Sequence, residues 1–217
     1  MYVGRIVAIG RTQRGALAAM YRVSSRSFPN RQAKVLDRAV AILPKAGHEK
    51  DIERNPYIAY NCLRLAGDCA IAANGAHTDP IAEKIDSGMG IRDALAAVLL
   101  AMDYEHDAYN TPRIAAVVRH GARAGYLGIV RNDALLVREF PLEQGTAYYL
   151  CTYEQNAPEP SYTDPDFDAD SAADACQVIL GRGAFANLER PITAACALAQ
   201  NDGTFEVATA DAPVPNR

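Results

Sequence analysis

The clearest strand signal lies at the N-terminus, where residues 2–23 read YVGRIVAIGRTQRGALAAMYRV. Two apolar runs, residues 2–9 and 16–23, flank a polar turn at residues 11–15 that ends in glycine. Apolar runs of this length separated by a short polar turn are typical of a β-hairpin. We therefore expect the chain to open with two antiparallel strands.

Further strand signals occur before and after a helical centre. The apolar runs that precede it lie at residues 35–43, 58–65 and 69–73. Those that follow it lie at residues 113–118, 125–130, 135–140, 147–153 and 205–209. The first three of the later runs are joined by short polar turns, which predicts an antiparallel meander.

The helical signals are fewer. Residues 79–86 form a short helical pattern, and residues 90–102 form a longer one with a single apolar face made by Ile91, Leu95, Val98, Leu99 and Met102. A third helix is expected at residues 171–180, capped by Asp170 or Ser171. Strands, two helices and more strands without regular alternation predict an α+β protein with largely antiparallel sheets.

Nothing in the middle of the chain resembles a linker, so we expect one catalytic domain over residues 1–217. Residues 154–170 are rich in acidic residues and proline and should form a surface loop. Residues 210–217, which contain two prolines, should form a tail.

Composition narrows the class of protein. Hydrophobic residues make up 49% of the chain, which is typical of a globular protein, and no apolar run approaches the roughly 20 residues that span a bilayer. The N-terminus lacks a signal-peptide pattern. Five cysteines, without a Cys-x-x-Cys pair, indicate reduced thiols. We therefore expect a cytoplasmic protein that does not contact membranes.

A cluster of donors follows the hairpin, where residues 22–31 read RVSSRSFPNR. Arginine forks match phosphate oxygens bidentately, and three crowded guanidiniums become favourable when a multivalent anion lies among them. The segment therefore indicates a phosphate site, with a solvated basic turn as an equally weighted alternative.

The distribution of charge favours the phosphate site. Residues 1–64 contain twelve Lys and Arg against four Asp and Glu, whereas the remaining residues contain ten against twenty-two. Surfaces that bind nucleic acid usually carry extended basic stripes. Here the basic residues are spaced among apolar segments and the pI is about 5.6. A compact pocket for a phosphorylated small molecule fits better than a nucleic-acid surface.

Four polar segments lie at the ends of predicted elements: residues 22–31, 55–61, 74–79 and 103–113. Their sequences RVSSRSFPNR, NPYIAYNC, NGAHTD, MDYE and NTPRIAA, together with CTYEQ at residues 151–155, resemble the archaeal type of IMP cyclohydrolase. The likeness is nearly collinear over residues 1–155 and looser afterwards.

This resemblance implies an enzyme that closes 5-formamidoimidazole-4-carboxamide ribotide (FAICAR) to inosine monophosphate (IMP) with loss of water. It also implies a four-layer αββα sandwich similar to that of the N-terminal-nucleophile hydrolases. Those enzymes attack with a Ser, Thr or Cys at the processed N-terminus. Position 2 is Tyr here, so we do not expect that covalent mechanism.

Residue type and resemblance together suggest roles. Tyr60 and Glu105 are the candidate proton-transfer pair, and Arg31 is the third candidate catalytic residue. Arg26 and Arg31 should hold the phosphate or the developing oxyanion, with the two roles left open between them. The remaining candidates for substrate or phosphate binding are Arg22, Ser24, Ser25, Asn30, Asn61, Asn74 and Arg113.

Each candidate also has a plain structural interpretation. A strand tyrosine such as Tyr60 is most often half-buried packing, and a carboxylate such as Glu105 after a helix is most often a surface charge. Histidines and acids show no metal-ligand spacing, and no dinucleotide or Walker motif occurs, so no metal and no cofactor are expected.

Other functions are distinguishable from the cyclohydrolase. An amidohydrolase of the same layered fold would need a processed nucleophile, and a non-catalytic purine-nucleotide-binding protein would bind without turnover. The partner expected here is a small ribotide substrate. Small cytosolic enzymes commonly form symmetric oligomers, so a homo-oligomer is also expected.

Overall fold

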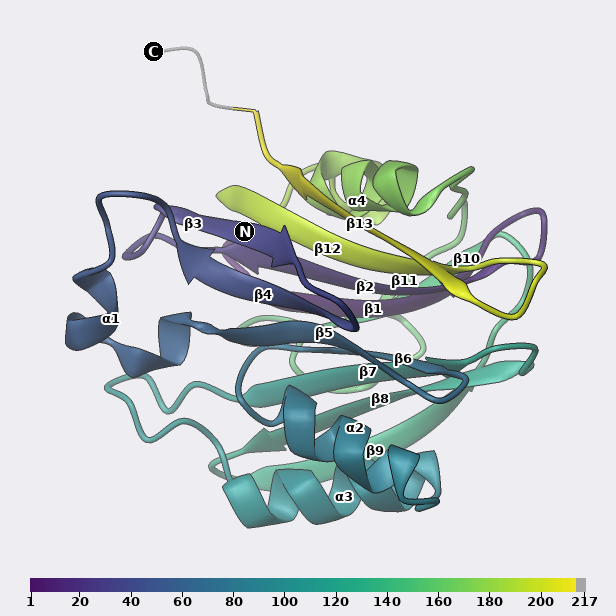
Figure 1. The fold of residues 1–217 in the computed structure, drawn as a ribbon, viewed down its shortest axis with the longest axis horizontal. Coiled ribbons are helices and arrows are strands. Elements are labelled where there is room, and N and C mark those ends of the chain that lie inside the picture. Colours follow the sequence, from purple (N-terminus) through teal and green to yellow (C-terminus); the bar gives the residue numbers. More distant parts are fainter. Residues whose placement is uncertain (214–217) are drawn as a thin grey trace.

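The structure is a computed structural model that describes residues 1–213, and it contains two antiparallel sheets (Figure 1). The first sheet has the strand order β11-β10-β1-β2-β12-β13. Its strands are β1 Ile6–Arg11, β2 Leu17–Ser24, β10 Thr146–Cys151, β11 Thr163–Asp164, β12 Pro191–Ala199 and β13 Phe205–Asp211.

The second sheet has seven strands in sequence order, β3 to β9. They are β3 Arg31–Val35, β4 Ala39–Pro44, β5 Tyr60–Ala66, β6 Cys69–Ala73, β7 Arg113–Arg119, β8 Ala124–Arg131 and β9 Ala134–Pro141. The helices are α1 Asp51–Arg54, η1 Pro56–Ile58, α2 Thr78–Asp86, α3 Ile91–Met102, α4 Ala172–Gly181 and η2 Gly183–Phe185.

The predicted N-terminal hairpin is confirmed as β1 and β2, which pair antiparallel with Ile6 opposite Arg22 and Ile9 opposite Ala19. The two faces of β1 enter different cores: Val7 and Ile9 face the second sheet, while Ile6 and its neighbours on that face pack towards α4. A strand buried on both faces has no polar alternation. This double burial explains the continuous apolar run in the sequence.

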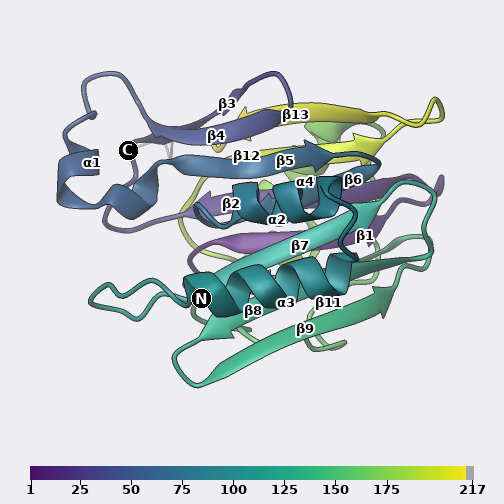
Figure 2. The ribbon, with the colours of Figure 1, turned by 60° about the horizontal axis from the view of Figure 1, so that its bottom comes forward.

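Three hydrophobic cores define the layers. One lies between the two sheets, one between the first sheet and α4, and one between the second sheet and the pair α2 and α3. Figure 1 shows α4 above the first sheet, and Figure 2 shows α2 and α3 lying across the outer face of the second. The structure confirms an α+β fold with antiparallel sheets, and its layers are compatible with a sandwich.

Several boundaries differ from the sequence-based expectations. The first strand begins at Ile6 because Gly4 has a φ of +73°, a left-handed conformation that interrupts extended backbone. The run at residues 35–43 is not one strand: Val35 ends β3 and Ala39 begins β4, and between them the Leu36 amide donates to the Ala39 carbonyl across a turn. The alanine-rich β12 was not predicted, because alanine carries no strand signal.

The segment at residues 154–170 is only partly at the surface. It contains β11, which pairs with β10, and Phe167 within it is fully buried against the layer that contains α4. The cap of α4 is Ser171, whose hydroxyl accepts from the Asp174 amide at 3.1 Å. The expected tail at residues 210–217 begins inside β13, and residues 214–217 lie outside the described part.

Candidate active site at one end of the two sheets

The four polar segments meet at one end of the molecule, the end that carries α1 (Figure 1). Strand β2 ends at Ser24 and β6 ends at Ala73, whereas β5 begins at Tyr60 and β7 begins at Arg113. Antiparallel neighbours bring the end of one strand beside the start of the next. The topology therefore gathers segments that are far apart in the sequence.

A cavity of about 570 Å³ lies at this end. This volume is within the range of roughly 300–1,000 Å³ typical of small-molecule sites. Its walls combine aromatic rings with charged and polar side chains. The residues that line it are Tyr2, Arg5, Ser25, Arg26, Ser27, Phe28, Arg31, Arg54, Asn55, Pro56, Tyr57, Ile58, Glu105, Asp107, Ala108, Tyr109 and Tyr153.

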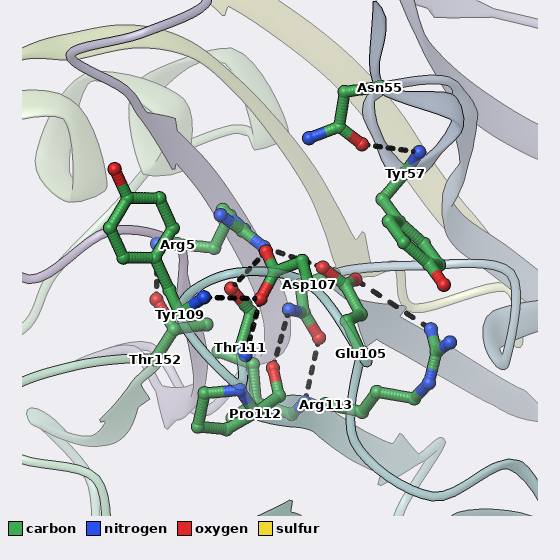
Figure 3. Close-up of polar contacts among 12 residues, drawn as sticks. Arg5, Asn55, Tyr57, Glu105, Asp107, Tyr109, Thr111, Pro112, Arg113 and Thr152 are labelled. Carbon is green, nitrogen blue, oxygen red and sulfur yellow. Dashed lines mark hydrogen bonds and ion pairs between the residues drawn. The ribbon is translucent and has the colours of Figure 1, made fainter.

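Glu105 lies at the centre of the charged cluster, between two arginines (Figure 3). Its carboxylate is 1% exposed, and Oε2 accepts from Arg5 Nη2 at 3.3 Å. Oε1 lies 3.7 Å from Arg113 Nη1. The Glu105 backbone forms an isolated bridge with Thr111, and Arg113 Nε donates to the Asp103 carbonyl, so both partners are anchored.

Burial raises the pKa of Glu105 to about 6, although Arg5 and Arg113 act in the opposite direction. For Arg5, burial lowers the pKa, but the Glu105 carboxylate and the neighbouring tyrosines more than offset this and raise it overall. The two arginines hold the Glu105 carboxylate charged at neutral pH, while its raised pKa makes it a better proton acceptor than an exposed glutamate.

Tyr60 forms the second polar pair. Its hydroxyl lies 2.6 Å from the hydroxyl of Tyr21 on β2, and both rings are buried between the sheets. Burial raises the pKa of Tyr60, against the effect of the nearby Arg31 and Arg5. Tyr60 is therefore a protonated phenol at neutral pH. It lies near Arg31 and Arg5, which line the cavity, but Tyr60 itself is not among the lining residues.

Arg31 and Arg26 occupy different depths of the cavity. Arg31 is 3% exposed and donates from Nε to the Phe28 carbonyl at 3.2 Å. Arg26 is 56% exposed at the rim, where it pairs with Glu189 at 2.7 Å and lies over the ring of Tyr2. Ser25 also lines the cavity, and its hydroxyl accepts from the Phe28 amide.

The structure places Arg22 and Ser24 outside the cavity. Arg22 is fully buried towards α4 and η2, where it donates to Ser24 Oγ and to the carbonyl oxygens of Ile179, Phe185, Leu188 and Glu189. Burial lowers the pKa of Arg22 to about 10. These contacts favour a structural role, in which Arg22 donates hydrogen bonds to backbone carbonyl groups at the end of α4 and in the segment that follows it.

Three predicted asparagines also have partners outside the cavity. Asn30 lies beside His48, with 3.2 Å between Nδ2 and the His48 Nδ1 atom. Asn61 donates to Asp79 at 2.9 Å, on the side of the sheet that faces α2. Asn74 is fully buried and bonds to the Pro112 carbonyl and the Ile114 amide, so it fixes β6 against β7.

Sequence reasoning missed several residues of the cavity. Arg5 is the most important, and a signal for it existed: it is an arginine within an otherwise apolar strand-like run. Tyr57 and Asp107 lay inside polar segments already singled out, but their types did not distinguish them. Tyr2 and Tyr153 stack on each other with ring centres 5.8 Å apart, a contact between chain segments that no local pattern shows.

None of the helices within residues 1–213 has the length and apolar character that a bilayer span requires. Within the same residues, no three His, Cys, Asp or Glu side chains gather in a way that fits a metal ion. The five cysteines are buried and free.

Comparisons with known proteins agree with this picture. A family described as "IMP cyclohydrolase-like protein" matches residues 2–203. An IMP cyclohydrolase from Methanocella arvoryzae is 48% identical over 215 residues, which cover 98% of this chain and 100% of the relative. One from Methanococcus aeolicus is 44% identical over 96% of this chain and 100% of the relative. A third, from Halobacterium salinarum, is 48% identical over 82% of this chain and 83% of the relative. The chain therefore belongs to the IMP cyclohydrolase family.

Proposed function

We propose that this enzyme converts FAICAR to IMP and water in the cavity described above. The observation that carries the proposal is the Glu105 carboxylate, held by Arg5 at the base of a cavity that also contains Arg26 and Arg31. A proton acceptor beside several guanidiniums suits an anionic ribotide whose reaction consists of bond formation and proton transfer.

The reaction needs no nucleophile from the protein. The carboxamide nitrogen of FAICAR bonds to the carbon of the formyl group in the same molecule, and the nitrogen loses one proton while the formyl oxygen gains one. This bond closes the ring, and the resulting hydroxyl then leaves as water with a proton from the former formamido nitrogen as a C=N bond to that nitrogen forms. Alignment of two groups within one molecule can supply on the order of 7 kcal/mol of the barrier.

Glu105 and Tyr60 are proposed to move these protons. With a pKa raised to about 6, Glu105 is ionised at neutral pH and accepts the proton from the attacking nitrogen. Burial keeps the Tyr60 phenol protonated, so it donates to the formyl oxygen. Burial raises the pKa of both groups, but the pKa of Glu105 stays below neutral pH and that of Tyr60 stays above it, which supports this division of roles.

Arg31 and Arg26 are proposed to have different roles, because they lie at different depths in the cavity. Arg31 is buried and close enough to Tyr60 and Glu105 to influence both, so we assign it to the oxyanion that develops on the formyl oxygen. Arg26 lies at the exposed rim, where it can exchange Glu189 for a phosphate. Ser25 supplies a neutral donor beside it.

The order helix, sheet, sheet, helix supports a relationship to the N-terminal-nucleophile hydrolases, with catalysis that does not use an N-terminal nucleophile. Both sheets contribute to one central core, which supports a single catalytic domain. A cytoplasmic homo-oligomer is proposed as well, and light scattering on the purified protein tests its oligomeric state.

The decisive experiment mixes the purified protein with FAICAR in the presence of EDTA and follows IMP by absorbance and chromatography. We expect catalytic formation of IMP that is proportional to enzyme concentration. A folded protein that binds FAICAR without forming IMP would instead be a nucleotide-binding protein, and the proposal would fail.

A further inference from the structure

Three buried polar atoms lie close together around Gly75. They are Glu105 Oε1, Arg113 Nη1 and His77 Nδ1, and within residues 1–213 none of them has a hydrogen-bond partner. A methyl carbon built on Gly75 would lie 2.8 Å from the arginine atom, 3.2 Å from the histidine atom and 3.4 Å from the glutamate atom. The three atoms therefore lie around one point beside the Gly75 Cα, the position that a Cβ would occupy.

The hydrogen-bonding character of these atoms can be assigned. His77 Nε2 lies 3.0 Å from the Ile114 carbonyl, which can only accept, so Nε2 carries the proton and Nδ1 presents a lone pair. Burial, with a contribution from Arg113, lowers the pKa of His77 to about 3, so the ring is neutral. The space is therefore faced by two acceptors, Nδ1 and the Glu105 oxygen, and by one donor, the Arg113 N–H.

We infer that Gly75, His77, Glu105 and Arg113 form a binding site for one ordered water molecule. The water donates one hydrogen to Glu105 Oε1 and the other to His77 Nδ1, and it accepts from Arg113 Nη1. Buried waters typically make about three hydrogen bonds to polar groups that are otherwise unsatisfied. Two atoms 3.7 Å apart, as Glu105 Oε1 and Arg113 Nη1 are, can both lie within about 3 Å of one oxygen.

Other occupants fit this set of donors and acceptors less well. A cation would lie against the Arg113 guanidinium, and an anion would face the Glu105 carboxylate and the lone pair of His77. A methyl group would come too close to Arg113, whose Nε is fixed by the Asp103 carbonyl at 2.8 Å. Of these occupants, only water supplies two donors and one acceptor.

The water site assigns a function to the motif at residues 74–79. Gly75 and His77 of this motif help to position the Glu105 carboxylate on the side of Oε1. Arg5 holds Oε2 on the cavity side, while the water and Arg113 hold Oε1 on the opposite side. A hydrogen bond to the ionised form lowers the pKa of a carboxyl group, so the water counteracts the effect of burial. The charged or titratable groups that face Glu105 are Arg5, Arg31, His77, Asp107 and Arg113.

The first test is a high-resolution crystal structure of the unmodified protein without substrate. We expect electron density for a water within about 3.2 Å of all three atoms. Clear density for the three side chains without a water between them would overturn the inference. This test uses the unmodified protein, so it does not require any substituted protein to fold.

The second test compares Gly75→Ala with Gly181→Ala. Alanine at position 75 displaces the water, whereas a methyl group at position 181, at the end of α4, meets nothing within 4 Å. Carbon-13 NMR titration should show the pKa of Glu105 about one unit higher in Gly75→Ala and unchanged in Gly181→Ala. An unchanged pKa in a folded Gly75→Ala protein would contradict the inference.

The catalytic meaning of the site rests on the proposed function, but neither test uses FAICAR. If the water is present and IMP does not form, the site stands and the proposed reaction fails. If IMP forms and the water is missing, the reaction stands and the site fails.

Discussion

The Arg5 guanidinium and the Glu105 carboxylate lie 3.3 Å apart although one hundred positions separate them in the sequence. Arg5 directly precedes β1 of the first sheet, and Glu105 lies in the connection between α3 and β7 of the second. This ion pair therefore joins the two sheets at the end where the cavity opens. It also places a charged acceptor where the proposed reaction requires one.

Removal of the Glu105 charge should abolish most of the activity. Glu105→Gln keeps the shape of the side chain but cannot accept the proton, so we expect kcat to fall by about 10²- to 10⁴-fold. Steady-state kinetics with FAICAR measure this loss. Glu83→Gln is the matched control, because Glu83 is an exposed glutamate on α2. Equal rates for Glu105→Gln and the unmodified enzyme would remove Glu105 from the mechanism.

The pH dependence of kcat/KM should report the ionisation of Glu105. Its pKa is raised to about 6, and only the ionised form accepts a proton, so activity should fall as the pH drops below about 6. The pH profile between 4.5 and 8 at constant ionic strength measures this limb. A profile that stays flat down to pH 5 would contradict the assignment.

The substitution Arg5→Met should shift the acidic limb of the pH profile to higher pH. Without the guanidinium, burial raises the pKa of Glu105 further, so activity should begin to fall at a higher pH than in the unmodified enzyme. Arg5→Lys retains a positive charge and should lie between the two. An identical acidic limb in all three proteins would show that Arg5 does not act on Glu105.

The paired tyrosines should respond differently to loss of their hydroxyls. Tyr60→Phe removes the proposed donor and should reduce kcat by about 10²-fold or more. Tyr21→Phe removes only the partner that lies 2.6 Å from the Tyr60 hydroxyl, so a smaller loss is expected. Both variants are compared by kcat and by thermal unfolding. Full turnover by Tyr60→Phe would exclude it as the donor.

Substitution of Arg22 should lower the stability of the protein, whereas substitution of Arg31 should impair its activity. Arg22→Met leaves several buried carbonyl oxygens without a donor, so the free energy of unfolding should fall by about 3 kcal/mol while KM changes little. Arg31→Ala should impair kcat/KM instead. Denaturant unfolding and kinetics distinguish the two effects. Arg14→Met, at a largely exposed ion pair with Asp170, should leave stability almost unchanged and serves as the control.

Local sequence patterns were sufficient for much of the fold. The hairpin of β1 and β2, helix α3 and the meander of β7 to β9 are each formed by contacts close in the sequence, and each was predicted. The split of residues 35–43 and the strand β12 were not. Strand β12 depends on a distant part of the chain, because it pairs with β2. Strands β3 and β4 instead form a local hairpin, whose short turn lies inside the apolar run.

For the candidate site too, the sequence determined some features and the tertiary structure determined others. The sequence alone determined that clustered arginines, a tyrosine and a glutamate lie near the ends of elements, because these residue types and motifs are visible along the chain. Only the tertiary structure decided which of them meet: it turned Arg22 towards α4, kept Arg31 at the cavity and brought Arg5 to Glu105. The physical reason is that alternate residues of a strand point to opposite faces, and the burial of each face depends on the sheet or helix that covers it.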